Sequence, residues 1–183
     1  MNYWQGKNIR LRALEPSDAA SFFAWDQDSD MGRYIDRVWQ PVSLESQKRW
    51  TERASAQEPG DEFFFVIDNL AGEMVGSIST HHCDRRTGVF SYGVAVQVDF
   101  QRRSYASEAI RMVLRYFFEE LRYQKVNVEI HSDNPASSRL HESLGFQLEG
   151  RVRRSVYSGG QFLDNLLYGM TAEEFHGSDQ TPR

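Results

Sequence analysis

The residues 99–109 form a short polar segment with two neighbouring arginines, and they suit the binding of an anion. An alternating apolar segment precedes them and a segment with helical spacing follows. A strand that turns directly into a helix leaves backbone N–H groups without partners at the start of that helix. These groups and the helix dipole favour an anion, typically a phosphate, beside Arg102 and Arg103. The alternative is an ordinary connection with a solvated arginine pair.

A second group of chemically useful side chains lies in residues 25–41. Four aspartates, Asp26, Asp28, Asp30 and Asp36, alternate there with the apolar or aromatic residues Met31, Tyr34, Ile35, Val38 and Trp39. Carboxylates among aromatic rings suit a cation or an amine. The alternative is a solvated loop with a hydrophobic anchor. In either case the segment is too apolar for a plain linker, and we predict it to be a loop.

The patterns of apolar residues predict the elements that position these groups. In order, they are a strand at 8–14, helices at 16–25 and 43–55, strands at 63–67, 74–79 and 90–98, a helix at 106–121, a strand at 126–130, a helix at 135–144, and strands at 146–157 and 162–170. Three hairpin-spaced strands followed by helix, strand and helix indicate a mixed α/β (α+β) fold.

Length and composition limit the class of protein. The 183 residues suit one domain, which we place at 1–176, with a loose, disordered tail at 177–183. A net charge of −5 argues against general nucleic-acid binding, and no apolar run is long enough to cross a membrane. The single cysteine, Cys83, excludes an intrachain disulfide and favours a reducing cytoplasm. His81-His82-Cys83-Asp84 is better explained as a surface turn than as a metal site, so we expect no metal.

Two segments resemble a known family. Gln101-x-x-Ser104-x-Ala106 resembles the Gln/Arg-x-x-Gly-x-Gly/Ala signature of the GNAT acyltransferase superfamily. Residues 134–146 resemble that family's Asn-x-x-Ser-x-x-Leu-Tyr-Glu-x-x-Gly-Phe segment. The order of predicted elements is similar to the whole GNAT fold, a mixed, mostly antiparallel sheet flanked by helices. Leu11-Arg12, residues 149–151, the turn at Gly159-Gly160, Asp164 and Tyr168 are also similar to the RimJ/RimL-like branch, which includes spermidine and ribosomal-protein N-acetyltransferases.

The resemblance implies an acetyl-coenzyme A-dependent N-acetyltransferase that acts on a primary amine of a small molecule or on a peptide N-terminus. The rival interpretation is a non-catalytic module that binds acyl-coenzyme A or another ligand. The implied cofactor-binding residues are Val96, Val98, Gln101, Arg102, Arg103, Ser104, Tyr105, Ala106, Ser107, Asn134 and Ser137. The implied acceptor-side residues are Asp28, Asp30 and Tyr34. Assembly as a homo-oligomer stays open.

Three departures from the family pattern concern the chemistry. Ser104 replaces the usual glycine, and serine can cap a helix but demands ordinary backbone angles. Ser91 stands where branch members often carry a glutamate base, which leaves Glu129, Glu142 and the acidic segment as candidate bases.

The third departure is His141, which replaces the family's general-acid tyrosine and is our candidate catalytic residue. It shares a helix face with Asn134. It could donate a proton, accept one, or be a polar helix residue without a proton role.

Overall fold

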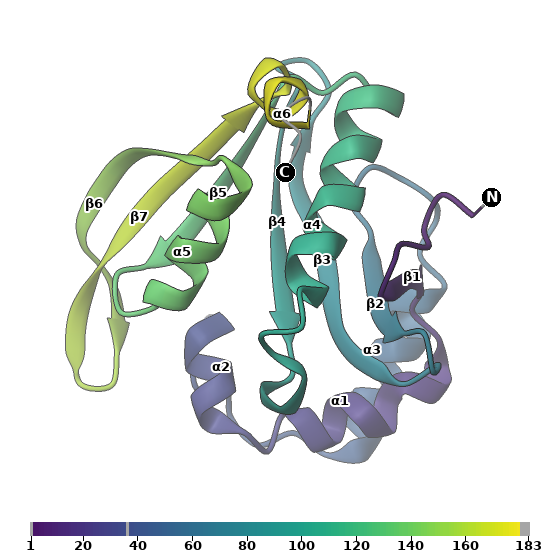
Figure 1. The fold of residues 1–183 in the computed structure, drawn as a ribbon. Coiled ribbons are helices and arrows are strands. Elements are labelled where there is room, and N and C mark those ends of the chain that lie inside the picture. Colours follow the sequence, from purple (N-terminus) through teal and green to yellow (C-terminus); the bar gives the residue numbers. More distant parts are fainter. Residues whose placement is uncertain (1, 36, 180–183) are drawn as a thin grey trace. The chain divides into compact units, whose positions relative to one another are not determined.

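The computed structural model describes residues 2–35 and 37–179. The strands are β1 (Ile9–Ala13), β2 (Phe64–Asn69), β3 (Met74–Asp84), β4 (Val89–Val96), β5 (Lys125–His131), β6 (Gln147–Ser158) and β7 (Gln161–Thr171). The α-helices are α1 (Ala19–Trp25), α2 (Ser29–Ile35), α3 (Leu44–Ser55), α4 (Tyr105–Arg115), α5 (Pro135–Leu144) and α6 (Ala172–Asp179). Two 3-10 turns, Pro16–Asp18 and Val98–Phe100, precede α1 and α4, and a π-helical turn, Tyr116–Glu120, follows α4. Figure 1 labels the strands and the α-helices.

The strands form a seven-stranded sheet in the order β1-β2-β3-β4-β5-β7-β6. β4 pairs with β5 in parallel, whereas β1 with β2, β2 with β3, β5 with β7 and β6 with β7 pair antiparallel. Helices flank this sheet. The prediction of a mixed, mostly antiparallel sheet flanked by helices is therefore confirmed.

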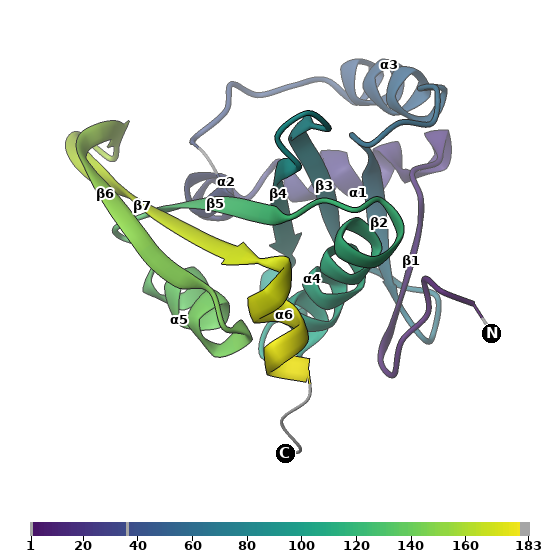
Figure 2. The same cartoon turned by 90° about the horizontal axis from the view of Figure 1, so that it is seen from above.

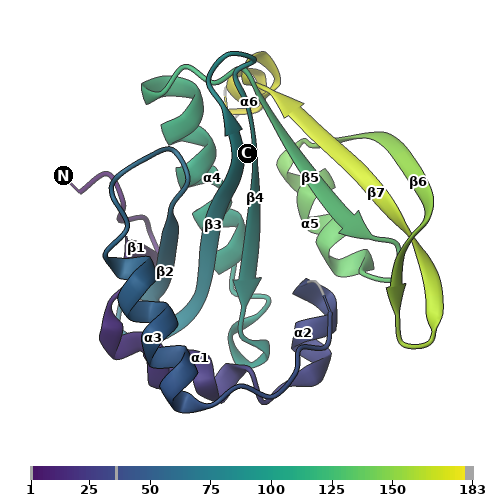
Figure 3. The same ribbon diagram turned by 180° about the vertical axis from the view of Figure 1, so that it is seen from behind.

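The chain divides into two compact units, and the division falls within β3, β4 and α4. The first unit contains the residues up to Thr80 together with Gly93–Met112, and the second contains His81–Tyr92 and the residues from Val113 onward. In the first unit α1 and α3 lie beside each other (Figure 3). There Phe22 packs edge-to-face against Trp25 and Trp50. In the second unit the rings of Phe90 and Phe117 stack with centroids 3.8 Å apart.

Two segments differ from the sequence-based expectation. Residues 25–41 contain α2 where we predicted a loop, because one carboxylate oxygen of Asp28 accepts hydrogen bonds from the backbone N–H groups of Asp30 and Met31, both at 3.0 Å. Helix α6 follows β7 directly and extends over residues 177–179, which we placed in a loose tail (Figure 2). Phe175 is buried in this helix, while residues 180–183 lie outside the described residues.

Candidate functional site

The connection between β4 and α4 has an unusual backbone. After the 3-10 turn Val98–Phe100, Gln101 is extended, and then Arg102 and Ser104 both adopt positive φ, 61° and 62°. The expectation that Ser104 demands ordinary backbone angles is wrong, because it occupies the left-handed region that glycine adopts without strain. Reversals of backbone handedness in successive residues turn N–H groups toward one concave face, which is an anion-binding arrangement.

Side chains within the turn hold this backbone in place. The side-chain amide of Gln101 donates to the carbonyl of Val96 over 3.1 Å, and the guanidinium of Arg103 donates to the carbonyl of Asp99 over 3.2 Å. The N–H of Glu108 donates to the carbonyl of Ser104 over 3.0 Å. The N–H groups of residues 105–107 precede this bond and are the orphan donors of the helix start. Gln101 and Arg103 thus position the turn, while the backbone supplies the donors for an anion.

Relief of the strain at Ser104 should stabilise the protein. A left-handed residue other than glycine costs roughly 1–2 kcal/mol, which substitution by glycine would recover. Part of this recovered free energy is lost again because glycine is more flexible in the unfolded chain. We expect Ser104→Gly to raise the free energy of unfolding by about 0.5–1 kcal/mol, as measured by urea denaturation. Ser107→Gly, within helix α4, is the matched control and should lower it. A lower stability for Ser104→Gly would contradict the strain assigned to this position.

The end of β4 is held close to β3 before it enters the turn. A Cβ atom on Gly76 would lie 2.3 Å from the carbonyl oxygen of Ala95, so only glycine permits this approach. Val96 is partly buried, whereas Val98 is 56% exposed. The side-chain nitrogen of Gln97 is buried and has no hydrogen-bond partner within the described part of the chain. Sequence reasoning missed Gln97, although it directly precedes the turn.

In the second unit, the residues predicted on one face of α5 are brought together. The side chain of Asn134 caps the helix, where its oxygen accepts from the N–H of Ser137 at 3.1 Å. His141 is only 1% exposed, and its Nδ1 lies 2.8 Å from the carbonyl oxygen of Ser137. Because a carbonyl can only accept, Nδ1 carries the proton and Nε2 does not. Nε2 has no partner among residues 2–35 and 37–179.

Tyr92 on β4 lies beside His141 and was not singled out from the sequence. The two rings stack with centroids 5.9 Å apart and an interplanar angle of 24°. Burial raises the pKa of Tyr92 well above its usual value, and it lowers the pKa of His141 against the opposing effect of the Ser137 carbonyl. The Tyr92 hydroxyl also lacks a hydrogen-bond partner in the described chain. The pair therefore combines a neutral hydroxyl donor with a neutral imidazole acceptor.

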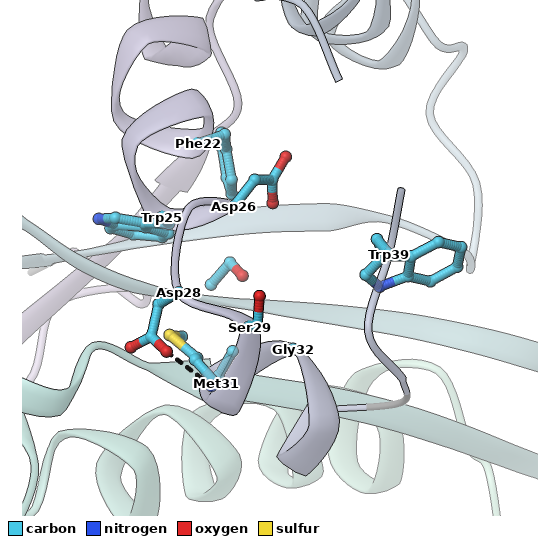
Figure 4. Close-up of a pocket in the computed structure, with 10 residues that line it drawn as sticks. Phe22, Trp25, Asp26, Asp28, Ser29, Met31, Gly32 and Trp39 are labelled. Atoms are coloured by element: carbon cyan, nitrogen blue, oxygen red, sulfur yellow. Dashed lines mark hydrogen bonds between the residues drawn. The ribbon is translucent and has the colours of Figure 1, made fainter. Parts of the chain in front are cut away.

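A cavity of about 110 Å³ lies in the first unit beside α1 and α2 (Figure 4). It is lined by Phe22, Trp25, Asp26, Asp28, Ser29, Met31, Gly32, Trp39, Ser77 and Ala95. Burial raises the pKa of Asp26, whose carboxylate accepts a hydrogen bond from the side chain of Gln47 at 2.8 Å.

The predicted acceptor-side residues relate differently to this cavity. Asp28 lines it, but one of its oxygens caps α2. Asp30 is exposed and is not among the lining residues, while the Tyr34 side chain lies outside the described residues. The prediction from sequence also did not select Asp26, Trp25 and Trp39, which line the cavity. The acidic and aromatic composition of residues 25–41 could have indicated them.

The predicted cofactor residues thus fall into two sets. The continuous set 96–107 belongs to the first unit, and Asn134 and Ser137 belong to the second together with His141. Within the part of the chain that the structure describes, no three histidine, cysteine, aspartate or glutamate side chains are grouped to hold a metal ion. No helix in that part is long and apolar enough to cross a membrane.

Comparison with known proteins gives a consistent result. The acetyltransferase (GNAT) domain family matches residues 8–147. The SPbeta prophage-derived uncharacterized N-acetyltransferase YokL of Bacillus subtilis (strain 168) is 41% identical over 175 residues, 96% of each chain. The uncharacterized N-acetyltransferase YoaA of the same organism is 27% identical over 165 residues, 87% of this chain and 91% of YoaA. A spermidine N-acetyltransferase from Vibrio cholerae, solved with CoA and spermine, has a similar fold with a TM-score of 0.81 and 18% identity, covering 92% of this chain and 98% of that one.

Proposed function

Because this chain belongs to the GNAT acetyltransferase family, we propose that it transfers an acetyl group from acetyl-coenzyme A to a primary amine of a small molecule or a protein N-terminus. The observation that carries this proposal is the turn before α4, where Arg102 and Ser104 adopt positive φ at the start of a helix. The pyrophosphate of the cofactor is the anion that we assign to this turn. The segments that resemble the RimJ/RimL-like branch support an amine acceptor.

Direct acetyl transfer places three demands on the protein. The acceptor amine must be neutral when its lone pair attacks the thioester, the carbonyl oxygen must be stabilised, and the leaving thiolate must receive a proton. An amine of the lysine type has a pKa near ~10.4 and an α-amine one near ~7.7–8.0, so the former needs more help to lose its proton.

The buried side chains of Tyr92 and His141 can together form hydrogen bonds with a small polar group. Burial keeps His141 in its neutral form, and this argues against a role as an imidazolium acid. Its bare Nε2 can accept a hydrogen bond, and the hydroxyl of Tyr92 can donate one. We propose that His141 acts as an acceptor and that Tyr92 takes the donor role that the family assigns to a tyrosine on the helix.

We propose that the cavity beside α1 and α2 binds a charged group of the acceptor other than the reacting amine, and that Asp26 recognises this charge. Asp26→Asn should raise the KM for a cationic acceptor about tenfold, which corresponds to about 1.4 kcal/mol, and leave kcat nearly unchanged. Asp30→Asn is the control, because Asp30 is absent from the cavity lining. Steady-state kinetics with the best acceptor measures both. Equal KM values for the wild type and both variants would show that residues 25–41 do not recognise the charge of the acceptor.

A thiol-release assay tests the proposed function itself. Purified protein with acetyl-coenzyme A is mixed separately with polyamines, amino sugars, amino acids and peptides with free N-termini. We expect release of free thiol with at least one of these amines and acetylation of that amine by mass spectrometry. Calorimetric binding of acetyl-coenzyme A without thiol release from any amine would instead support the non-catalytic ligand-binding alternative.

A further inference from the structure

Strand β5 in the second unit has one apolar and one polar face. Val126, Val128 and Ile130 are buried on the first face, while Lys125, Asn127, Glu129 and His131 alternate with them on the second. The antiparallel partner β7 places Asn165 directly opposite His131 on that polar face. The parallel partner β4 places Ser91 beside Asn127. The polar face of β5 therefore lies beside Ser91 of β4, the position at which branch members often carry a glutamate.

Glu129, His131 and Asn165 share one end of this face, where His131 and Asn165 are paired in the strand register. The side-chain nitrogen of Asn165 donates a hydrogen bond to the carboxylate of Glu129. Asn165 is only 8% exposed, yet its side-chain oxygen has no partner in the described residues. The Nδ1 atom of His131 is likewise buried and has no partner there. One carboxylate thus stands beside two buried polar atoms whose hydrogen-bonding capacity is unused.

A solvated strand face does not account for this group. Buried polar atoms are nearly always hydrogen-bonded, because burial without a partner is costly. The oxygen of Asn165 and the carboxylate of Glu129 only accept hydrogen bonds, and the Nδ1 of a neutral histidine can accept one as well. The ligand that fits a negatively charged set of acceptors is a cation with several N–H donors. A primary ammonium group carries one positive charge and three such donors.

We propose that Glu129, His131 and Asn165 bind the primary ammonium group of the acceptor and that Glu129 takes its proton. This inference rests on the proposed acetyl transfer and supplies the base that the sequence pattern lacks at Ser91. Among the other candidates, Glu142 on α5 accepts a hydrogen bond from the hydroxyl of Tyr168 at 2.8 Å. Glu129 is exposed, so its carboxylate is accessible to a ligand.

Acetyl transfer with Glu129 as the base accounts for every proton, bond and electron pair. Glu129 receives one proton from the ammonium group and leaves a neutral amine, whose lone pair attacks the carbonyl carbon of the acetyl thioester. The new C–N bond forms, the C–S bond breaks, and the sulfur leaves as a thiolate with the bonding electron pair. The thiolate takes a proton from the hydroxyl of Tyr92, the second proton of the nitrogen restores that hydroxyl, and Glu129 returns its own proton to solvent. No oxidant, reductant or metal is required.

The charged neighbours of Glu129 on this face do not neutralise its carboxylate, which is therefore available to a cation. On the same face of β5, Lys125 is paired with Glu149 of β6 at 2.8 Å, and His131 is the other titratable group. The residues of β4 and β7 that pair with this face of β5 are uncharged, namely Val89, Ser91, Asn165, Leu167, Gly169 and Thr171. The ammonium ion is therefore the partner that the carboxylate of Glu129 lacks on this face.

The pH dependence of Glu129→Gln tests the proposal. At pH 7 we expect kcat/KM to fall at least ~100-fold, the usual contribution of a general base. The deficit should shrink about tenfold per pH unit as the free amine increases, and it should level off near the acceptor's own pKa, ~7.7–8.0 for a peptide N-terminus and ~10.4 for a lysine-type amine. A merely structural role lowers kcat/KM by one constant factor at every pH, and that result would overturn the base assignment. Glu120→Gln removes an exposed carboxylate from the same unit and is the control.

A binding measurement separates this proposal from the proposed function. Calorimetry at pH 7 with n-butylammonium should show saturable binding to the wild type, at least tenfold weaker binding to Glu129→Gln and to Asn165→Leu, and none of n-butanol. Circular dichroism verifies that both variants are folded. Equal affinity of n-butylammonium for wild type and variants overturns the ammonium site, even if acetylation proceeds. Absence of thiol release from every amine, with the binding pattern intact, would instead overturn acetyl transfer alone.

Discussion

Ala106→Asp is expected to abolish the binding of acetyl-coenzyme A while leaving the protein folded. Ala106 is the second residue of α4, directly after the turn in which Ser104 adopts a positive φ. A carboxylate at this position would face the pyrophosphate that we assign to the turn, and two like charges in contact repel strongly. The same carboxylate is favourable for the free protein, because acidic side chains in the first turn of a helix are stabilised by its dipole.

The opposite signs of these two effects make the experiment decisive. Calorimetry should show affinity for acetyl-coenzyme A reduced by at least ~100-fold, about 2.7 kcal/mol, and urea denaturation should show equal or higher stability. Ala106→Asn has nearly the same size without the charge, and it should bind within about tenfold of the wild type. Unchanged affinity in Ala106→Asp would exclude this turn as the pyrophosphate site. Equal losses in both variants would assign the effect to size instead of charge.

Local patterns were sufficient to predict most elements of the fold, but not α2 and α6. Alternation along β5 and helical spacing along α4 are produced by burial of one face, so they appear directly in the sequence. The caps of α5 were also predictable, because Asn134 and Gly145 act within the helix they end. Helix α2 was missed because its seven residues contain a glycine and begin with an aspartate pattern that also occurs in loops.

The details of the candidate site depend on contacts that local patterns do not carry. The positive φ of Ser104 is imposed by the surrounding turn, and serine gives no local indication of it. The stacking of Tyr92 on His141 and the pairing of His131 with Asn165 join residues that are distant in the sequence. Motif similarity therefore pointed to the turn that we assign to the pyrophosphate, while the candidates for proton transfer required the pairing of strands and the burial of individual atoms.

The second large effect is expected for His141→Gln, which should slow turnover by at least ~100-fold if the histidine takes part in the chemistry. In the structure Nδ1 donates to the carbonyl of Ser137, so the active atom is the unprotonated Nε2. Burial lowers the pKa of His141 below its usual value near ~6.5, so the neutral form prevails at pH 7. Turnover that needs this neutral form falls as the pH drops through the lowered pKa. The part of the pH profile of turnover that depends on His141 therefore lies on the acid side, below about pH 6.5.

The pH profile of kcat distinguishes the remaining roles of His141. Glutamine cannot titrate, so His141→Gln should lose the acid limb, whereas His176→Gln, which changes an exposed histidine on α6, should retain it. A limb in which turnover falls as the pH rises would instead support an imidazolium acid, against the direction of its pKa shift. Tyr92→Phe preserves the ring stack and removes only the hydroxyl, so it measures the donor separately. Near-normal turnover and an unchanged profile in His141→Gln would leave this histidine as a buried helix residue that holds Tyr92 in place.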